Sequence, residues 1–380
     1  MPNHLQRLRE FGQSPWLDFI DRALLAKGEL KRLIQEDGIC GLTSNPTIFE
    51  KAIGGGTDYD EDIARLLREH PDAMPREIFY RLAVQDIRAA ADTLWPVYEA
   101  AEGHDGLVSL EVSPDLAHDT EATVEEARRL FRHVDRRNLM IKVPATRAGL
   151  PAIETLIAEG INVNVTLLFS VERYRAVVGA YLQGLQRRRA AGEPLDHVAS
   201  VASFFVSRVD TLVDDLLAKR AAEDPERRED YEALMGTLAI ANAKAAYRHY
   251  QAAFDGEDFA PLRAAGAQTQ RLLWASTGTK NARYSDVLYV DNLIGPDTVN
   301  TLPPQTLKAF REHGDPAPRL MEGMDEALDR LRRLDALGVD LGAATDRLEA
   351  EGVEAFAQSF RSLLDTVAAH SRRLEQRARA

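Results

Sequence analysis

The stretch of this chain that decides its fold is LMIKVPAT, residues 139–146, in which Lys142 stands among apolar side chains. A short apolar run of this kind is typical of a strand buried on both faces, as in a parallel sheet covered by helices. A lysine there is unfavourable unless it is paired or neutral, and burial favours the neutral amine, which attacks carbonyl carbons. One hypothesis is therefore an enzyme that forms a Schiff base with an aldehyde or ketone. The alternative, commoner for a single lysine, is a buried stem whose charged head reaches water.

Short apolar runs alternate with amphipathic stretches on both sides of this segment. The predicted strands are 16–20, 38–43, 107–112, 139–143, 162–169, 199–205, 272–276 and 287–293. Predicted helices separate most of them, at 21–36, 78–101, 121–134, 150–159, 171–190, 207–222 and 231–254. This alternation predicts parallel strands joined by right-handed crossovers, and eight strands in series predict an α/β fold, the closed (β/α)₈ TIM barrel.

The chain is longer than a minimal barrel, and the additional residues fall in three places. We predict a single domain over residues 1–380, with helical insertions near 49–102 and 207–270 and a helical tail from about residue 303. In this tail, apolar side chains recur at helical spacing: Val353, Phe356, Phe360, Leu363, Leu364 and Val367. We expect this C-terminal helix to pack on the barrel, over the mouth of the site.

Charge and composition argue against several classes of function. The formal net charge of −13 is unlike that of a general nucleic-acid-binding protein, which needs basic patches. No stretch approaches the ~20 apolar residues of a transmembrane helix, and residues 1–11 lack the apolar region of a signal peptide. The single cysteine, Cys40, allows no intramolecular disulfide, and the nine histidines show no metal-binding spacing. We expect a cytoplasmic protein without a metal, a membrane partner or a nucleic-acid partner.

Polar residues stand at or just after seven of the predicted strand ends, where barrel enzymes carry their reacting groups. They are Asp18, Thr43, Asn45, Glu111, Lys142, Asn164, Thr166, Ser203, Arg208, Ser276 and Lys280. Taken singly, each has a structural explanation. Asn45 before Pro46 fits a helix cap, and Asp18 could cap the first helix. Arg208 could pair with Asp210 on a helix surface, where such pairs contribute little.

The alternation along residues 162–169 favours the functional interpretation. Asn164 and Thr166 lie on one face of this strand, and the residues that alternate with them along the strand are apolar. Because helices cover the outside of a barrel, the apolar face points outward and the polar face points inward. The same rule places Lys142 inward. Carboxylates and amides gathered around one amine suit proton transfer and carbonyl chemistry.

A second group of residues predicts a phosphate site. Arg208, Ser276 and Lys280 follow late strands of the series, near which barrels commonly bind phosphate. Two cations and a hydroxyl can hold one phosphate. An acidic chain needs such a local basic pocket if its ligand is phosphorylated.

Five ordered segments of the chain resemble the transaldolase family, and the long form found in bacteria is the most similar. They are GLTSNPTIF at 41–49, LMIKVPAT at 139–146, INVNVTLLFS at 161–170, ASFFVSRVD at 202–210 and DNLIGP at 291–296. The resemblance implies a class I aldolase-type barrel that needs no metal or organic cofactor. It also implies a pentose-phosphate reaction, in which a dihydroxyacetone unit moves from sedoheptulose 7-phosphate to glyceraldehyde 3-phosphate. The products are erythrose 4-phosphate and fructose 6-phosphate.

The resemblance also implies a role for each candidate residue. Lys142 matches the Schiff-base lysine, and Asp18 matches the acid/base that deprotonates a substrate hydroxyl during cleavage. Glu111 and Thr166 match the pair that holds a proton-relay water. The other matches are to substrate-binding residues: Thr43, Asn45, Asn164 and Ser203 in the pocket, and Arg208, Ser276 and Lys280 at the phosphate. Shorter transaldolases carry arginine at the position of Lys280, and lysine lacks the bidentate fork of arginine.

Three alternatives remain open from the sequence. A fructose 6-phosphate aldolase-like lyase of the same fold would release free dihydroxyacetone, but those enzymes are shorter and lack the carboxylate at the position of Glu111. A metal-dependent barrel lyase would need clusters of histidine ligands. A non-catalytic sugar-phosphate-binding barrel would explain Arg208 and Lys280 but not an inward Lys142. Phosphorylated sugars are the expected partners, and the sequence gives no prediction of oligomeric state.

Overall fold

The computed structural model describes residues 2–379, which form a closed eight-stranded barrel surrounded by helices. Each strand pairs in parallel with the next, and β8 pairs with β1, which confirms the predicted (β/α)₈ barrel. The strands are β1 Gln13–Asp18, β2 Gly41–Thr43, β3 Leu107–Glu111, β4 Leu139–Pro144, β5 Val163–Leu168, β6 Ser200–Phe205, β7 Gln270–Ala275 and β8 Thr298–Leu302.

The helices before β5 are α1 His4–Glu10, α2 Arg22–Ala26, α3 Glu29–Asp37, α4 Pro46–Gly54, α5 Asp60–Glu69, α6 Pro75–Ala100, α7 Thr120–Val134 and α8 Gly149–Ala158. Those that follow are α9 Val171–Ala190, α10 Ser207–Glu223, α11 Arg228–Glu232, α12 Leu238–Phe254, α13 Ala260–Ala264, α14 Leu288–Asn292, α15 Pro304–His313, α16 Met324–Ala336 and α17 Leu341–Arg379. Short 3₁₀ helices lie at Pro114–Leu116 (η1), Pro225–Arg227 (η2) and Arg319–Met321 (η3). No helix within residues 2–379 is long and apolar enough to cross a membrane.

The predicted position of the eighth strand was wrong. Residues 287–293 contain the helix α14, and β8 follows at Thr298–Leu302. Val287, Val290 and Leu293 are three residues apart, which is a helical spacing, whereas β8 carries the β-branched residues that favour strands.

Two predicted helices are each divided by a glycine. The helix predicted at 21–36 is broken at Gly28, and the one predicted at 231–254 is broken around Gly236. Both glycines have positive φ, 71° and 68°, a conformation that ends a right-handed helix.

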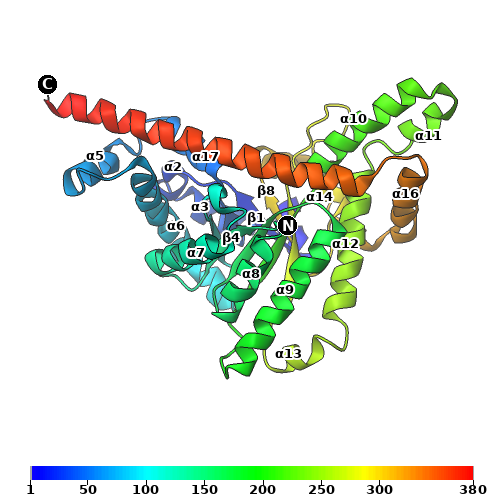
Figure 1. Ribbon diagram of the computed structural model, residues 1–380, viewed down its shortest axis with the longest axis horizontal. Helices are drawn as coiled ribbons and strands as arrows, with labels where there is room; N and C mark the ends of the chain where they lie inside the picture. Colours follow the sequence, from blue (N-terminus) through cyan, green and yellow to red (C-terminus); the bar gives the residue numbers. More distant parts are fainter. Residues whose placement is uncertain (1, 380) are drawn as a thin grey trace.

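The C-terminal helix α17 crosses the mouth of the barrel and contacts β5, α4, α5, α6 and α10 (Figure 1). Its predicted apolar face is confirmed. Phe356, Phe360, Leu363 and Val367 are buried, and Val353 and Leu364 pack against the core at its edge. Polar contacts also hold the helix in place, including an ion pair of 3.1 Å between Arg173 Nε and Glu349 Oε2.

Candidate active site

Nine of the predicted site residues line one cavity of about 290 Å³ at the carboxyl ends of the strands. They are Asp18, Thr43, Asn45, Lys142, Thr166, Ser203, Arg208, Ser276 and Lys280. The other two, Glu111 and Asn164, contact residues of this set, namely Lys142 and Ser203. The structure therefore brings together all the residues that the strand ends suggested.

Lys142 lies at the centre of this arrangement, between strands that carry polar partners at the same level. Glu111, Lys142 and Asn164 are register partners on β3, β4 and β5, so their side chains point to the same side of the sheet. Lys142 Nζ lies 3.3 Å from Glu111 Oε2 and donates a hydrogen bond of 3.0 Å to the carbonyl oxygen of Ser44. Only 5% of Lys142 and 7% of Glu111 is exposed. A buried pair of this kind is a weak source of stability, but it fixes where the amine points.

The pKa values of two carboxyl groups near this amine are shifted by their surroundings. Burial raises the pKa of Glu111 and of Asp18, and the positive charge of Lys142 opposes both shifts. The Asp18 carboxylate accepts a hydrogen bond of 2.7 Å from Thr43 Oγ1. A carboxyl group whose pKa is raised toward neutrality is suited to proton transfer. The competing structural role belongs to Asp21, whose carboxylate caps α2 through the N–H of Leu24.

Amide and hydroxyl groups from β5 and β6 complete the wall. Asn164 Nδ2 donates to Ser109 Oγ at 3.0 Å, and Ser203 Oγ donates to Asn164 Oδ1 at 2.6 Å. Thr166 Oγ1 is buried and has no hydrogen-bond partner among the described residues, and Glu111 Oε2, also buried, has no partner there other than Lys142 Nζ at 3.3 Å. Both atoms can therefore bind a water molecule or a substrate hydroxyl.

Asn45 both caps a helix and lines the cavity. Its Oδ1 accepts the N–H of Ile48 at 3.0 Å and so caps α4, with Pro46 at the first helical position. Asn45 also lines the cavity. The cap thus fixes this side chain at the cavity wall.

Cations also line the cavity, Arg208 and Lys280 among them. Arg208, in the first turn of α10, is half-buried, and this burial lowers the pKa of its guanidinium. Within residues 2–379 neither Arg208 nor Lys280 forms an ion pair, so the pairing of Arg208 with Asp210 that the structural alternative proposed is absent. The first turn of α10 has no side-chain cap, which leaves backbone N–H groups and the helix dipole to attract an anion.

The segment carrying Ser276 and Lys280 is tied to α10. Ser276 has a positive φ of 56°, its carbonyl accepts the N–H of Ser207 at 3.0 Å, and the two hydroxyls lie 2.9 Å apart. Strained backbone of this kind gathers at functional sites.

Two tyrosines fix the remainder of this segment. Tyr284 donates to Asp214 at 2.7 Å, and Tyr289 donates to Asp210 at 3.0 Å. Asp210 also accepts the N–H of Ala239 at 2.7 Å. The segment therefore cannot move away from Arg208 without breaking buried hydrogen bonds.

Nine further residues of the cavity were not named as site residues from the sequence, among them Lys51, Phe205, Thr301 and Phe356. Thr301, whose hydroxyl lies 2.6 Å from Thr43 Oγ1, was missed because β8 was misplaced. Phe356 belongs to α17, and its ring centroid lies 6.0 Å from Lys142 Nζ. The helical periodicity of the tail predicted that Phe356 is buried, but not its position above the amine. We find no sequence signal for Lys51, which reaches the cavity from α4.

The fold and the cavity define a class: closed (β/α)₈ barrels that carry a buried lysine and carboxylates at the carboxyl ends of the strands. A family model described as Transaldolase/Fructose-6-phosphate aldolase matches residues 15–367, and the chain belongs to this family.

Curated relatives match over almost their full length. The chain is 48% identical to Transaldolase 2 of Nostoc sp. over 371 residues, covering 96% of this chain and 97% of the relative. It is 49% identical to Transaldolase of Thiobacillus denitrificans over 362 residues, with coverages of 95% and 99%. It is 48% identical to Transaldolase 1 of Streptomyces avermitilis over 366 residues, with coverages of 96% and 95%. The predicted resemblance to transaldolase, and with it the prediction of an enzyme, is confirmed.

Proposed function

We propose that this chain is a transaldolase that uses Lys142 to form a Schiff base with a ketose phosphate. The reaction moves a dihydroxyacetone unit from sedoheptulose 7-phosphate to glyceraldehyde 3-phosphate and yields erythrose 4-phosphate and fructose 6-phosphate. One observation carries the proposal: a buried Lys142 amine, 3.3 Å from a Glu111 carboxylate, in a cavity also lined by Arg208 and Lys280, neither of which pairs with a carboxylate within residues 2–379.

The geometry supports a sequence of steps centred on the amine. Lys142 Nζ adds to the C2 carbonyl carbon of the donor sugar, and loss of water leaves an imine. Asp18 then takes the proton of the C4 hydroxyl as the C3–C4 bond breaks, and the aldehyde product leaves. The remaining three-carbon enamine attacks the acceptor aldehyde, Asp18 returns its proton to the new C4 hydroxyl, and hydrolysis of the new imine frees Lys142.

We assign the proton transfers of imine formation to Glu111 and Thr166. Glu111 Oε2, which pairs with Lys142 Nζ, and the Thr166 hydroxyl can together hold one water molecule beside the nitrogen, which adds or removes a proton as water leaves or returns. The hydroxyl and amide groups of Asn45, Asn164 and Ser203 would bind the substrate hydroxyls. Arg208, Ser276 and Lys280 would hold the phosphate, so that the sugar spans the cavity with its carbonyl at Lys142.

The experiment that tests this function is reduction by borohydride in the presence of fructose 6-phosphate, followed by peptide mass spectrometry. We expect a reduced three-carbon or six-carbon adduct on Lys142 and none in a Lys142→Met variant. A folded protein that binds the sugar without forming the adduct would instead support a non-catalytic sugar-phosphate-binding barrel. Full activity after EDTA treatment is expected, and its loss would favour a metal-dependent lyase.

The family name also covers fructose 6-phosphate aldolases, which would release free dihydroxyacetone. The carboxylate of Glu111 beside Lys142 favours the transferase, as does a chain that matches transaldolases over almost their full length. Incubation with fructose 6-phosphate and no acceptor distinguishes the two activities. A transaldolase releases little free dihydroxyacetone under these conditions, whereas an aldolase releases it continuously. We further propose a cytoplasmic location, in keeping with sugar phosphates as substrates.

A further inference from the structure

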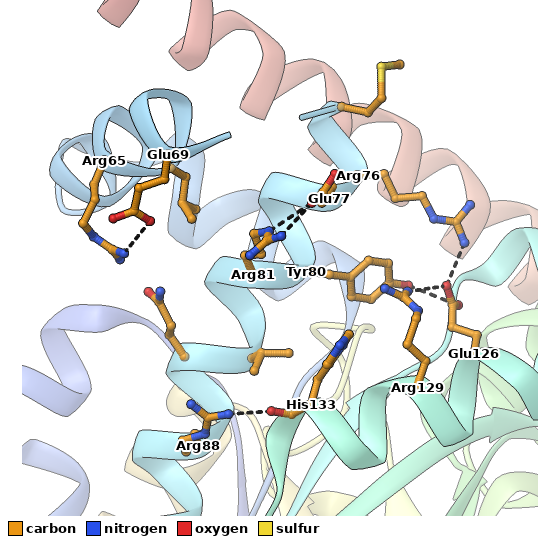
Figure 2. A pocket seen from close by; sticks show the side chains of 14 residues that line it. Arg65, Glu69, Arg76, Glu77, Tyr80, Arg81, Arg88, Glu126, Arg129 and His133 are labelled. Atoms are coloured by element: carbon orange, nitrogen blue, oxygen red, sulfur yellow. Dashed lines mark hydrogen bonds and ion pairs between the residues drawn. The ribbon is translucent and has the colours of Figure 1, made fainter. Parts of the chain in front are cut away.

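A second, larger cleft lies outside the barrel, between α5, α6 and α7, with a volume of about 730 Å³. Figure 2 shows side chains from α5 on one side of it, from α7 on the other, and from α6 between them. The catalytic cavity and this cleft share no lining residue. The size of the cleft lies within the usual range for small-molecule sites.

The cleft is rich in arginine although the chain as a whole is acidic. Five arginines line it, against three glutamates, whereas the whole chain has a net charge of −13. The arginines are Arg65, Arg76, Arg81, Arg88 and Arg129. A local excess of cations on a concave surface focuses a positive potential that attracts anions.

The ion pairs within the cleft leave most of the arginine donors free. Glu126 accepts hydrogen bonds from both Arg76, at 2.9 Å, and Arg129, at 3.1 Å, so one buried carboxylate serves two guanidinium groups (Figure 2). Arg81 pairs with Glu77 on its own helix. The side chains of Arg76, Arg81 and Arg129 remain 40%, 41% and 41% exposed. Each guanidinium has five N–H donors, so several still face the cleft.

Arg88 differs from an ordinary surface arginine. Its Nε and one terminal nitrogen donate to the carbonyl oxygens of Val134 and His133 at the end of α7, at 3.1 and 2.5 Å. Within the described part of the chain no carboxylate pairs with it. Helical ion pairs on the surface can account for Arg65 and Arg81, whereas Arg88 is held by the last carbonyls of α7 and keeps a positive charge that no carboxylate of the described residues neutralises.

The surroundings of His133 show that several of these charges converge on one place. Burial, and then the charges of Arg129, Arg132, Arg81 and Arg88, lower the pKa of this imidazole. Cations that come from both α6 and α7 therefore act on the same point. An anion bound there would relieve their mutual repulsion.

We propose that this cleft is a second binding site, and that its ligand is an anion with two or more adjacent phosphate groups, such as a nucleoside di- or triphosphate or pyrophosphate. Guanidinium forks match phosphate oxygens, and neighbouring phosphates can be held by arginines from α6 and α7 together. A single phosphate would meet only part of this set. The shared chemistry of these ligands is the polyphosphate group.

The test is isothermal titration calorimetry of the full chain with pyrophosphate, ATP and adenosine. The titrations use an Arg208→Gln background, so that anions do not bind at the proposed substrate phosphate site. We expect one saturable site for pyrophosphate and for ATP, and none for adenosine. Binding of adenosine as tight as that of ATP would mean that the cleft recognises the base, and the proposal would be wrong.

Charge variants within the cleft should change the affinity for pyrophosphate in opposite directions. Arg81→Gln and Arg129→Gln should each weaken pyrophosphate about tenfold, the loss of one charge-assisted contact. Glu77→Gln removes a competing carboxylate from the same wall and should strengthen binding. The matched control is Arg332→Gln on α16, whose arginine pairs with Asp329 on an exposed helix in the same way, and it should leave Kd unchanged. Equal Kd values in Arg81→Gln, Arg129→Gln and Arg332→Gln would overturn the proposal.

A second measurement does not depend on mutation. The imidazole of His133 can be titrated by NMR with and without saturating pyrophosphate in the same Arg208→Gln background. Because an anion offsets the charges that lower its pKa, we expect the pKa of His133 to rise on binding. Saturable binding without a change at His133 would place the anion elsewhere on the protein.

Discussion

Replacing Arg208 by glutamine separates binding of the phosphate from the carbonyl chemistry. The guanidinium stands in the first turn of α10, where burial lowers its pKa, and its carbon Cζ lies 5.5 Å from the ring centroid of Phe205. No carboxylate within residues 2–379 neutralises it. A half-buried cation of this kind gains most when an anionic ligand arrives, so its removal should weaken the phosphorylated complex far more than the folded protein.

The size of the effect follows from the contacts that a phosphate can make here. One hydrogen bond to a charged group contributes about 1.5–3 kcal/mol, and a guanidinium fork can form two of them. Glutamine keeps one donor, and Lys280 still lines the cavity. We therefore expect Arg208→Gln to lose about 3 kcal/mol of binding free energy, which is twice the lower value for one such bond. This corresponds to about a hundredfold decrease in kcat/KM.

The assay compares two acceptors, glyceraldehyde 3-phosphate and glyceraldehyde, with wild type and the Arg208→Gln variant. The hundredfold loss should appear with the phosphorylated acceptor, mainly as a higher KM, while kcat/KM for glyceraldehyde changes by about twofold or less. A comparable loss with both acceptors would refute the reasoning, because Arg208 would then act on the reacting carbons or on the fold. The midpoint of urea unfolding should be unchanged, since the substitution breaks no ion pair.

Three other changes test separate parts of the structure. Burial raises the pKa of Asp210 from 3.8 to about 7, so this group stabilises the fold fully below pH 3.8 and loses that contribution as the pH rises through 7. As the pH rises from about 5 to about 8, the free energy of unfolding measured in urea should decrease by about 2–3 kcal/mol less in Asp210→Asn than in wild type. Equal decreases in the two proteins would contradict this. Tyr284→Phe removes the 2.7 Å hydrogen bond to Asp214 and should raise KM for phosphorylated sugars at nearly constant kcat; a lower kcat at unchanged KM would contradict a positioning role. Phe356→Ala removes a buried ring above Lys142 and should lower the free energy of unfolding by about 3 kcal/mol. It should also increase borohydride trapping of small aldehydes on Lys142, and unchanged trapping would mean that the ring does not shield the amine.

The residues of the catalytic strands were predictable because strand geometry is local. Alternation along β5 placed Asn164 and Thr166 inward, and the same rule placed Lys142 inward. Register then brought Glu111 beside Lys142, since neighbouring strands of a parallel barrel carry register partners on the same side.

Residues that reach the site from other elements were not predictable in the same way. Thr301 was missed because an apolar run at helical spacing competed with the true eighth strand. Nothing local distinguishes Lys51 from any other lysine on a helix. The hydrogen bonds of Tyr284 and Tyr289 to α10 join residues far apart in the chain, and only the packed structure determines such pairs.

The late position of α17 in the chain also determines when the amine of Lys142 becomes covered during synthesis. All strands of the barrel, and with them Lys142, have been synthesised once Leu302 is added, whereas Phe356 follows much later. Domains generally fold as the chain emerges, so the nascent barrel can assemble before the ring covers the amine. During that interval the ring of Phe356 does not yet cover Lys142. Shielding of the amine therefore depends on a helix that is synthesised after every strand of the barrel, and the amine of a newly made molecule is most open to carbonyl compounds before α17 docks.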